Sequence, residues 1–377
     1  MQTPNRNLFR ITRFILLRFP GLFRFLARFR APQQNLLLLK TDAIGDYILF
    51  RNYLEVLRKS ARYKDYRITL LGNELWQDIA LEHDREYVDD FIFIRPGDLD
   101  HLPLKTFKLG WRLFKNNYDV VLQPSYTRLL ITDGLAALTA ARHIVGFMGD
   151  IEGLPERYKT KTDQFYTIKL VLPAGKSFEF DRSQYFFSNV LDYPVNLKRP
   201  YLTVSKKIEK TLIIFPGAGV SKRRWEAEKF LVLIKLILEQ SNVRILIAGS
   251  ADETEIGNYL MERLPIGRVN NLAGKTPLTQ LIELIGNAAL VISNETSAVH
   301  IAAAVKTPAI CILGGGHFGR FAPYPVAVED APVCMFEQME CYNCNWNCIY
   351  QIKDGDPFPC ITAVTLEKVW ADVQHYL

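Results

Sequence analysis

The chain has 377 residues, which is too long for one ordinary core and suits two domains of typical size. Its 49% of hydrophobic and 23% of charged residues are typical of a soluble globular protein and exclude a disordered one. The net charge of +6 is local, because residues 1–30 carry seven Arg and no acidic residue, while the remainder balances 39 basic against 40 acidic residues. This balance excludes a general nucleic-acid-binding surface, and no nucleic-acid partner is expected.

Residues 1–34 form a basic, amphipathic segment ahead of the folded body. Arg interrupts it too often for a membrane span, which needs about 20 mostly apolar residues, and it lacks the apolar run and cleavage site of a secretory signal. Its Phe, Leu and Arg residues predict two helical stretches, broken at Pro20 and Gly21, that lie on an anionic membrane surface. The alternative is a helix packed on the protein's own body.

From residue 35 onward, short apolar runs alternate with helical patterns. Runs at 36–40, 67–71, 91–94, 119–123 and 142–146 predict the strands of a first domain, residues 35–195. A polar stretch that several prolines interrupt ends in a linker at 196–210. Runs at 211–215, 243–248, 269–272, 290–293 and 309–313 predict a second domain, residues 211–377. The fold class is α/β, with two Rossmann-like, doubly wound parallel-sheet domains that face a cleft.

Polar turns follow the first strand of each predicted domain. After the first, Asp42, Gly45 and Asp46 lie near a helix N-terminus, where either carboxylate could be a helix cap. We expect Asp46 to take a proton from an acceptor hydroxyl, with Asp42 and Gly45 in contact with the acceptor. After the first strand of the second domain, a turn with two glycines and three cations predicts a diphosphate site: Gly217, Gly219, Lys222, Arg223 and Arg224.

A strand, a polar turn, a short Ala-rich helix and a second strand span residues 290–316. The turn falls where a parallel sheet places ligands, and three glycines end the second strand. The donor-binding residues predicted here are Asn294, Glu295, Thr296, Ser297, His300 and Gly315. Two of the predictions have plain alternatives. Lys275 could reach a nucleotide or belong to an ordinary turn, and His300 could be a buried structural histidine.

Four stretches occur in matching order with those of one known family: 44–46, 216–225, 271–276 and 293–304. From about residue 36 to the C-terminus, the chain resembles glycosyltransferase family 9, the ADP-heptose:lipopolysaccharide heptosyltransferase family. The resemblance implies a GT-B fold and metal-independent sugar transfer with inversion. It implies that Asp46 is the catalytic carboxylate and that Arg223 and Arg224 are the basic pair, with Lys222 a close alternative. Glu295, Thr296 and His300 match the segment that holds the nucleotide sugar, in which the family usually has Asp and Gly where this chain has Glu295 and Ser297.

Five of the six cysteines lie in a Cys-rich segment, residues 334–360. The spacing of Cys341, Cys344, Cys348 and Cys360 could suit a structural zinc or an iron–sulfur ligand set. Reduced thiols with a packing role are an alternative. Disulfides are disfavoured because the chain shows no secretion signal. No cofactor is expected for catalysis.

These patterns predict a glycosyltransferase that moves a sugar, heptose or a related one, from ADP-heptose or another nucleotide-sugar donor to a lipid-linked saccharide acceptor. We expect it in the cytoplasm, peripheral on the inner face of the cytoplasmic membrane. Two alternatives stay open: a nucleotide-sugar epimerase of GT-B fold, and a non-catalytic nucleotide-sugar-binding protein.

Overall fold

The computed structural model describes residues 6–31, 33–207, 209–265 and 267–377. Within them the chain divides into two compact units. The first comprises the described residues of 1–176 and 181–196, and the second comprises the described residues of 177–180 and 197–377. The division after residue 196 falls one residue from the predicted domain end at 195.

The first unit contains a six-stranded sheet in the order β3-β2-β1-β4-β5-β6. All its strand pairs are parallel: β1 (Asn35–Lys40), β2 (Arg67–Asn73), β3 (Asp90–Ile94), β4 (Val120–Gln123), β5 (His143–Phe147) and β6 (Ile168–Leu170). Because helices cover both faces, the central strands are apolar throughout rather than alternating, as in the buried run of Leu36 to Leu39.

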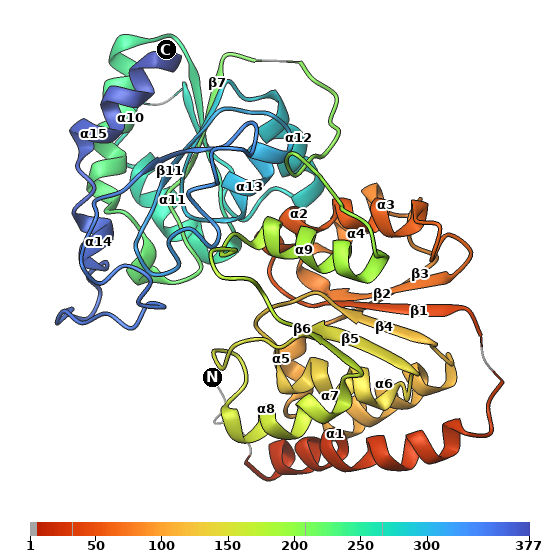
Figure 1. The fold of residues 1–377 in the computed structure, drawn as a ribbon. Coiled ribbons are helices and arrows are strands. Elements are labelled where there is room, and N and C mark those ends of the chain that lie inside the picture. The colour runs from red at the N-terminus through yellow and green to blue at the C-terminus, as the bar shows by residue number, and fades with distance from the viewer. Residues whose placement is uncertain (1–5, 32, 208, 266) are drawn as a thin grey trace. The chain divides into compact units, whose positions relative to one another are not determined.

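Figure 1 shows α2, α3 and α4 on one face of this sheet, and α5, α6 and α7 on the other. The bounds are α1 (Arg6–Ala27), α2 (Ile44–Phe50), α3 (Asn52–Lys59), α4 (Gln77–His83), α5 (Pro96–Leu99), α6 (Pro103–Lys115), α7 (Leu130–Leu138), α8 (Glu156–Thr162) and α9 (Glu179–Leu191), with 3-10 turns η1 (Glu74–Trp76) and η2 (Asp163–Phe165). The helix predicted after the first polar turn is two helices in the structure, α2 and α3, divided at Arg51, whose guanidinium is buried against Asp84 (2.7 Å).

The second unit repeats this plan with the sheet order β12-β11-β10-β7-β8-β9. Its strands, again all parallel, are β7 (Thr211–Phe215), β8 (Arg244–Ile247), β9 (Val269–Asn271), β10 (Leu290–Asn294), β11 (Ala309–Ile312) and β12 (Val333–Met335). Its helices are α10 (Ala227–Gln240), α11 (Thr254–Met261), α12 (Leu278–Asn287), α13 (Ser297–Ala304), α14 (Pro359–Thr362) and α15 (Leu366–Val373), with 3-10 turns η3 (Ser221–Arg223), η4 (Ala251–Glu253) and η5 (Gln374–Tyr376).

The strand order of each sheet fixes where a ligand can bind. In an open parallel sheet, ligands bind beyond the carboxyl ends of the strands, where the direction of winding reverses. That point lies between β1 and β4 in the first unit and between β7 and β10 in the second. The loops after β1, β7 and β10 are the three polar turns that the sequence singles out.

The N-terminal segment differs from the prediction of two helices. It forms one continuous helix, α1, with Pro20 inside it. Proline removes one backbone donor, but α1 continues through Pro20 because Leu16 and Phe23, on either side of it, are fully buried in the core of the first unit. Helix α1 packs on α6 and α7, and Gly134 of α7 leaves room for Leu16. Part of the segment thus belongs to the core of the first unit. Within the described residues, none of the helices has the length and apolar character that a membrane-crossing segment requires.

Candidate active-site loops

The loop after β1 holds the predicted catalytic carboxylate. Asp46 is half-buried in the first turn of α2, where the helix dipole favours a negative charge. Neither aspartate of this loop is the helix cap, since the N-cap is Ala43 and makes no side-chain cap bond. Gly45 is also half-buried, in the same turn. Asp46 is therefore not the N-cap of α2, which the sequence alone could not exclude.

Asp42 has a different position. Its carboxylate pairs with the buried Lys40 (2.6 Å) and accepts a hydrogen bond from Ser125 (2.6 Å) in the loop after β4. The indole of Trp76 donates to its backbone oxygen (3.0 Å). Asp42 thus ties together the two loops that flank the reversal between β1 and β4. Sequence reasoning missed both partners of Asp42. The contact of Ser125 depends on the pairing of β1 with β4, and the burial of the Lys40 side chain beside Asp42 is not visible in the sequence.

The turn after β7 is held from inside by Asn294 at the end of β10. The amide of Asn294 donates to the backbone oxygens of Pro216 (2.9 Å) and Gly217 (3.0 Å), and its oxygen accepts from the backbone of Trp225 (2.9 Å). Asn294 is fully buried. Asn294 therefore positions the turn, and its contact with a donor molecule stays a prediction.

The two glycines of this turn differ in their surroundings. A Cβ on Gly217 would collide with Glu253, so glycine is needed there for packing. Gly219 faces open space. Arg224 donates from Nε and Nη2 to the backbone oxygen of Ala218 (3.2 Å each). Gly219 is thus the position of this turn at which a ligand can approach the backbone.

Arg223 is the cation best placed to bind an anion. Its guanidinium lies over the ring of Trp346, 4.1 Å from the centroid. Its Nε is buried and, within the described residues, has no hydrogen-bond partner. Burial lowers the pKa of Arg223, and the nearby Glu295 opposes that shift. A buried donor without an acceptor is costly, so a ligand oxygen at this position would be stabilising.

Glu295 begins the turn after β10. Burial raises the pKa of its carboxyl to about 7, with Arg223 acting in the opposite direction. Thr296 is the N-cap of α13 and accepts from the backbone of Ala298 (3.3 Å), and its hydroxyl lies 3.0 Å from that of Ser293. Ser297 is the first residue of α13 and is half-buried. Near neutral pH, Glu295 can therefore serve as a hydrogen-bond donor.

His300 and Lys275 each have a partner within the protein. His300 is buried, with Nδ1 2.8 Å from the hydroxyl of Tyr324, and burial lowers its pKa to about 4. It is neutral at physiological pH and packs as a structural residue. Lys275 is exposed after the edge strand β9, and its ammonium donates to the backbone oxygen of Asn271 (3.1 Å).

The loop after β11 corrects an expectation from the sequence. The glycines at 314–316 were expected to admit a ligand, but aromatic rings of the Cys-rich segment fill that space. A Cβ on Gly315 would strike the ring of Tyr342, and one on Gly316 would strike Trp346. The amide of Gly315 donates to the sulfur of Cys360 (3.4 Å). The absence of a side chain at Gly315 is therefore explained by packing inside the protein, and a donor contact there stays a prediction.

The Cys-rich segment joins two of the loops. Trp346 contacts Gly316 on one side and Arg223 on the other. The backbone of Phe358 donates to the backbone oxygen of Lys222 (2.7 Å). The sequence marks this segment only by its cysteines and aromatic residues, so its role as a support for the turn after β7 was missed.

The four thiols proposed as metal ligands are free. Burial first, and then the charges of the other cysteines, raise the pKa of Cys341 and that of Cys360. In the described part of the chain, however, no group of three or more His, Cys, Asp or Glu side chains is arranged to hold a metal ion. As placed here, the thiols do not form a tetrahedral ligand set.

Two doubly wound parallel sheets with polar loops at the reversal of each define a GT-B glycosyltransferase fold, and solved structures agree. The Escherichia coli ADP-heptose lipopolysaccharide heptosyltransferase II has a TM-score of 0.67 at 18% identity, over 91% of this chain and 98% of that one. The model of glycosyltransferase family 9 (heptosyltransferase) matches residues 106–345. The chain belongs to this family and is a glycosyltransferase.

Curated relatives point the same way. The chain is 32% identical to lipooligosaccharide heptosyltransferase 2 of Haemophilus influenzae over 144 residues, which are 33% of this chain and 41% of that protein. It is 24% identical to lipopolysaccharide heptosyltransferase 1 of Campylobacter coli over 297 residues, 74% of this chain and 83% of that one. The match to the Haemophilus protein thus spans less than half of its length. Asp46 lies outside the region that the family model matches.

Proposed function

We propose that this glycosyltransferase moves a sugar, heptose or a related one, from ADP-heptose or another nucleotide sugar to a hydroxyl of a lipid-linked saccharide, with inversion. The observation that carries the proposal is the environment of Arg223. Its buried Nε has no partner among the described residues, and its guanidinium is fixed by Trp346. It lies where the second sheet reverses, so a nucleotide diphosphate is the ligand that these groups fit.

The reaction follows from the residue types. Asp46 accepts the proton of the acceptor hydroxyl while the oxygen of that hydroxyl forms a bond to the anomeric carbon. The bond from that carbon to the diphosphate oxygen breaks, and the electron pair leaves with the nucleotide diphosphate. Arg223, Arg224 and the backbone amide of Gly219 stabilise the developing charge.

Glu295 is suited to contact the donor beside Arg223 because the pKa of its carboxyl is about 7. A carboxylate beside Arg223 would compete with the diphosphate for the cation. A protonated carboxyl does not compete, and it can donate to an oxygen of the donor. Ser297 and Lys222 are further candidates for donor contact, and Gly45 for acceptor contact.

The membrane and metal assignments are also proposals. We place the enzyme at the cytoplasmic side of an anionic membrane, where a lipid-linked acceptor would be found. A structural zinc at Cys341, Cys344, Cys348 and Cys360 would need the thiols to come closer together than they lie here, and no catalytic step uses it.

The test is incubation with candidate nucleotide sugars, with and without lipid extract, while free nucleotide diphosphate is measured. A transferase releases the diphosphate only when both donor and acceptor are present. An epimerase converts the nucleotide sugar without lipid, and a binding protein converts nothing. Either of the last two results would refute the proposed function.

A further inference from the structure

Helix α1 has an apolar outer face that packing on the body does not explain. Its inward side buries Leu16 and Phe23. On its outward side, Ile11, Phe14, Leu22 and Phe25 are 49%, 57%, 51% and 54% exposed, and Phe29 just beyond the helix is 78% exposed. Their spacings of three, eleven, fourteen and eighteen residues from Ile11 place them along one side of a helix with 3.6 residues per turn. We call this set the outer stripe.

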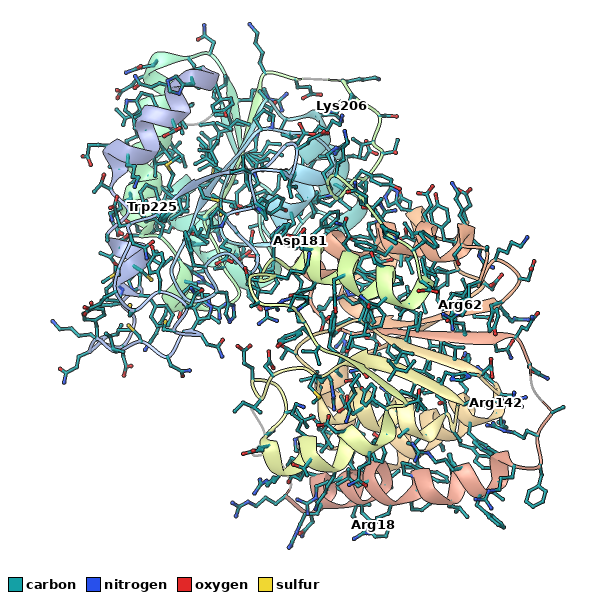
Figure 2. All side chains as sticks on the ribbon, in the orientation of Figure 1. Arg18, Arg62, Arg142, Asp181, Lys206 and Trp225 are labelled. Atoms are coloured by element: carbon teal, nitrogen blue, oxygen red, sulfur yellow. The ribbon has the colours of Figure 1, made fainter. Side chains whose placement is uncertain are left out.

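Next to the outer stripe lies a cavity of about 360 Å³ between α1 and α8. Five cations and the ring of Phe14 line it, and none of its lining residues is acidic: the cations are Arg10, Arg13, Arg18, Arg157 and Lys161. Figure 2 shows Arg18 on the side of α1 that faces away from the sheet. We call this cavity the α1–α8 pocket.

Two cations of the α1–α8 pocket contact the same tyrosine, Tyr158. Arg13 donates to the hydroxyl of the buried Tyr158 (2.6 Å), and Arg157 lies over the ring of Tyr158, 4.8 Å from its centroid. The carboxylate that follows α8, Asp163, is already paired with Arg128 (2.8 Å) and Lys159 (3.0 Å). Five like charges gathered around one cavity repel one another, and an anion bound there would relieve the repulsion.

A second cavity of about 390 Å³ shares Arg157 and Tyr158 with the α1–α8 pocket. Its other walls are mostly apolar and include Phe9, Leu130 and Leu154. A cationic pocket, an adjoining apolar cavity and an exposed apolar stripe together match a ligand with an anionic head and an apolar body.

We propose that the α1–α8 pocket binds the phosphate headgroup of an anionic phospholipid, while the outer stripe enters the interfacial layer of the bilayer. This inference rests on the proposed action of the enzyme at a membrane, and it names the lipid class and the residues that bind it. A soluble phosphate offers the same charge but gives the outer stripe no partner, so the bilayer lipid is the occupant to which the observations point.

The experiment measures binding of the full-length protein to vesicles of phosphatidylcholine with 30% phosphatidylglycerol, and to phosphatidylcholine alone. Deleting the N-terminal segment is not a usable test, because Leu16 and Phe23 belong to the core. Instead, the double variant Arg157→Gln/Lys161→Gln removes two pocket cations from exposed positions on α8. The matched control, Lys105→Gln/Lys108→Gln, removes two exposed cations from α6, which also packs on α1.

The wild type is expected to bind the anionic vesicles only. The pocket variant should bind them about thirtyfold more weakly, since each cation at such a surface contributes about fivefold, and the control variant should change by about threefold or less. Equal losses in the two variants would mean diffuse attraction and would overturn the pocket. Phe25→Ser/Phe29→Ser should also weaken vesicle binding. Unchanged binding in that variant would overturn the role of the outer stripe.

Glycerol 3-phosphate serves as the soluble probe. If it binds to the α1–α8 pocket while vesicles do not, the membrane assignment is overturned. Nucleotide diphosphate affinity is measured on the same samples and should not change in the pocket variant. Failure of the lipid proposal can thereby be distinguished from failure of the proposed transferase function, which the diphosphate-release assay tests.

Discussion

Glu295→Gln tests whether the carboxyl beside Arg223 is neutral in the folded protein. The pKa of Glu295 is raised from 4.5 to about 7, chiefly by burial. The folded protein therefore holds a proton that the unfolded chain has lost between these pH values. This contribution to stability is fully present below pH 4.5 and is lost as the pH rises through 7.

The magnitude follows from the two pKa values. A carboxyl with a pKa of about 7 in the folded state destabilises the protein by about 2.5 kcal/mol more at pH 8.5 than at pH 5. Because Glu295 is partly exposed, about 1 to 2.5 kcal/mol is the expected range. Gln keeps the shape of the protonated acid and does not ionise. Glu295→Gln should therefore become more stable relative to wild type by this amount as the pH is raised.

The assay is urea unfolding of both proteins at pH 5.0 and 8.5, using the transition of the second unit. The matched control is Glu239→Gln, which changes an exposed carboxylate on α10 of the same unit and should show the same difference from wild type at both pH values. If the stability difference between Glu295→Gln and wild type does not change with pH, Glu295 is ionised when folded. The proposal that its protonated carboxyl donates to the nucleotide sugar would then be wrong.

Three further predictions concern the second unit. Arg223→Ala should weaken nucleotide diphosphate binding by about 10- to 100-fold, the worth of a charge-assisted hydrogen bond, whereas Arg244→Ala at the start of β8 should leave it unchanged by calorimetry. Trp346→Leu should reduce the affinity for nucleotide diphosphate by about 3- to 10-fold, because Arg223 loses the ring over which it lies. Unaltered affinity would show that Trp346 does not position Arg223. If the four thiols at 341, 344, 348 and 360 hold a metal, reduced protein should contain about one zinc or an iron–sulfur chromophore per chain, and metal-free protein with every thiol titratable would reject the site.

Most of the fold could be predicted from local patterns in the sequence. Strands buried on both faces are continuous apolar runs, so β7 at Thr211–Phe215 has the predicted bounds. The N-terminal segment could not be predicted this way. Whether a helix containing Pro20 stays whole depends on what Leu16 and Phe23 contact, and those contacts lie on α6 and α7.

The site was predictable as three loops but not residue by residue. The turn after a strand of a parallel sheet lies at the edge where ligands bind, whatever the ligand is. Residues 41–46, 216–224 and 294–297 could therefore be predicted from the sequence. The individual roles depend on distant partners. The side-chain amide of Asn294 donates to the backbone oxygens of Pro216 and Gly217, and Gly315 faces Tyr342 rather than open space. No local pattern encodes such pairings, since the partners are far apart in the chain.

The central claim is that Asp46 is the base that activates the acceptor, and Asp46→Asn tests it most directly. The matched control is Asp78→Asn, which changes an exposed aspartate in the first turn of α4 and so causes the same loss of charge at a helix N-terminus. Turnover should fall by about 10²–10⁴ in Asp46→Asn and stay near wild type in the control, with nucleotide diphosphate affinity unchanged in both. Near-normal turnover of Asp46→Asn would contradict the account and leave Asp46 as only a favourable charge on the α2 dipole.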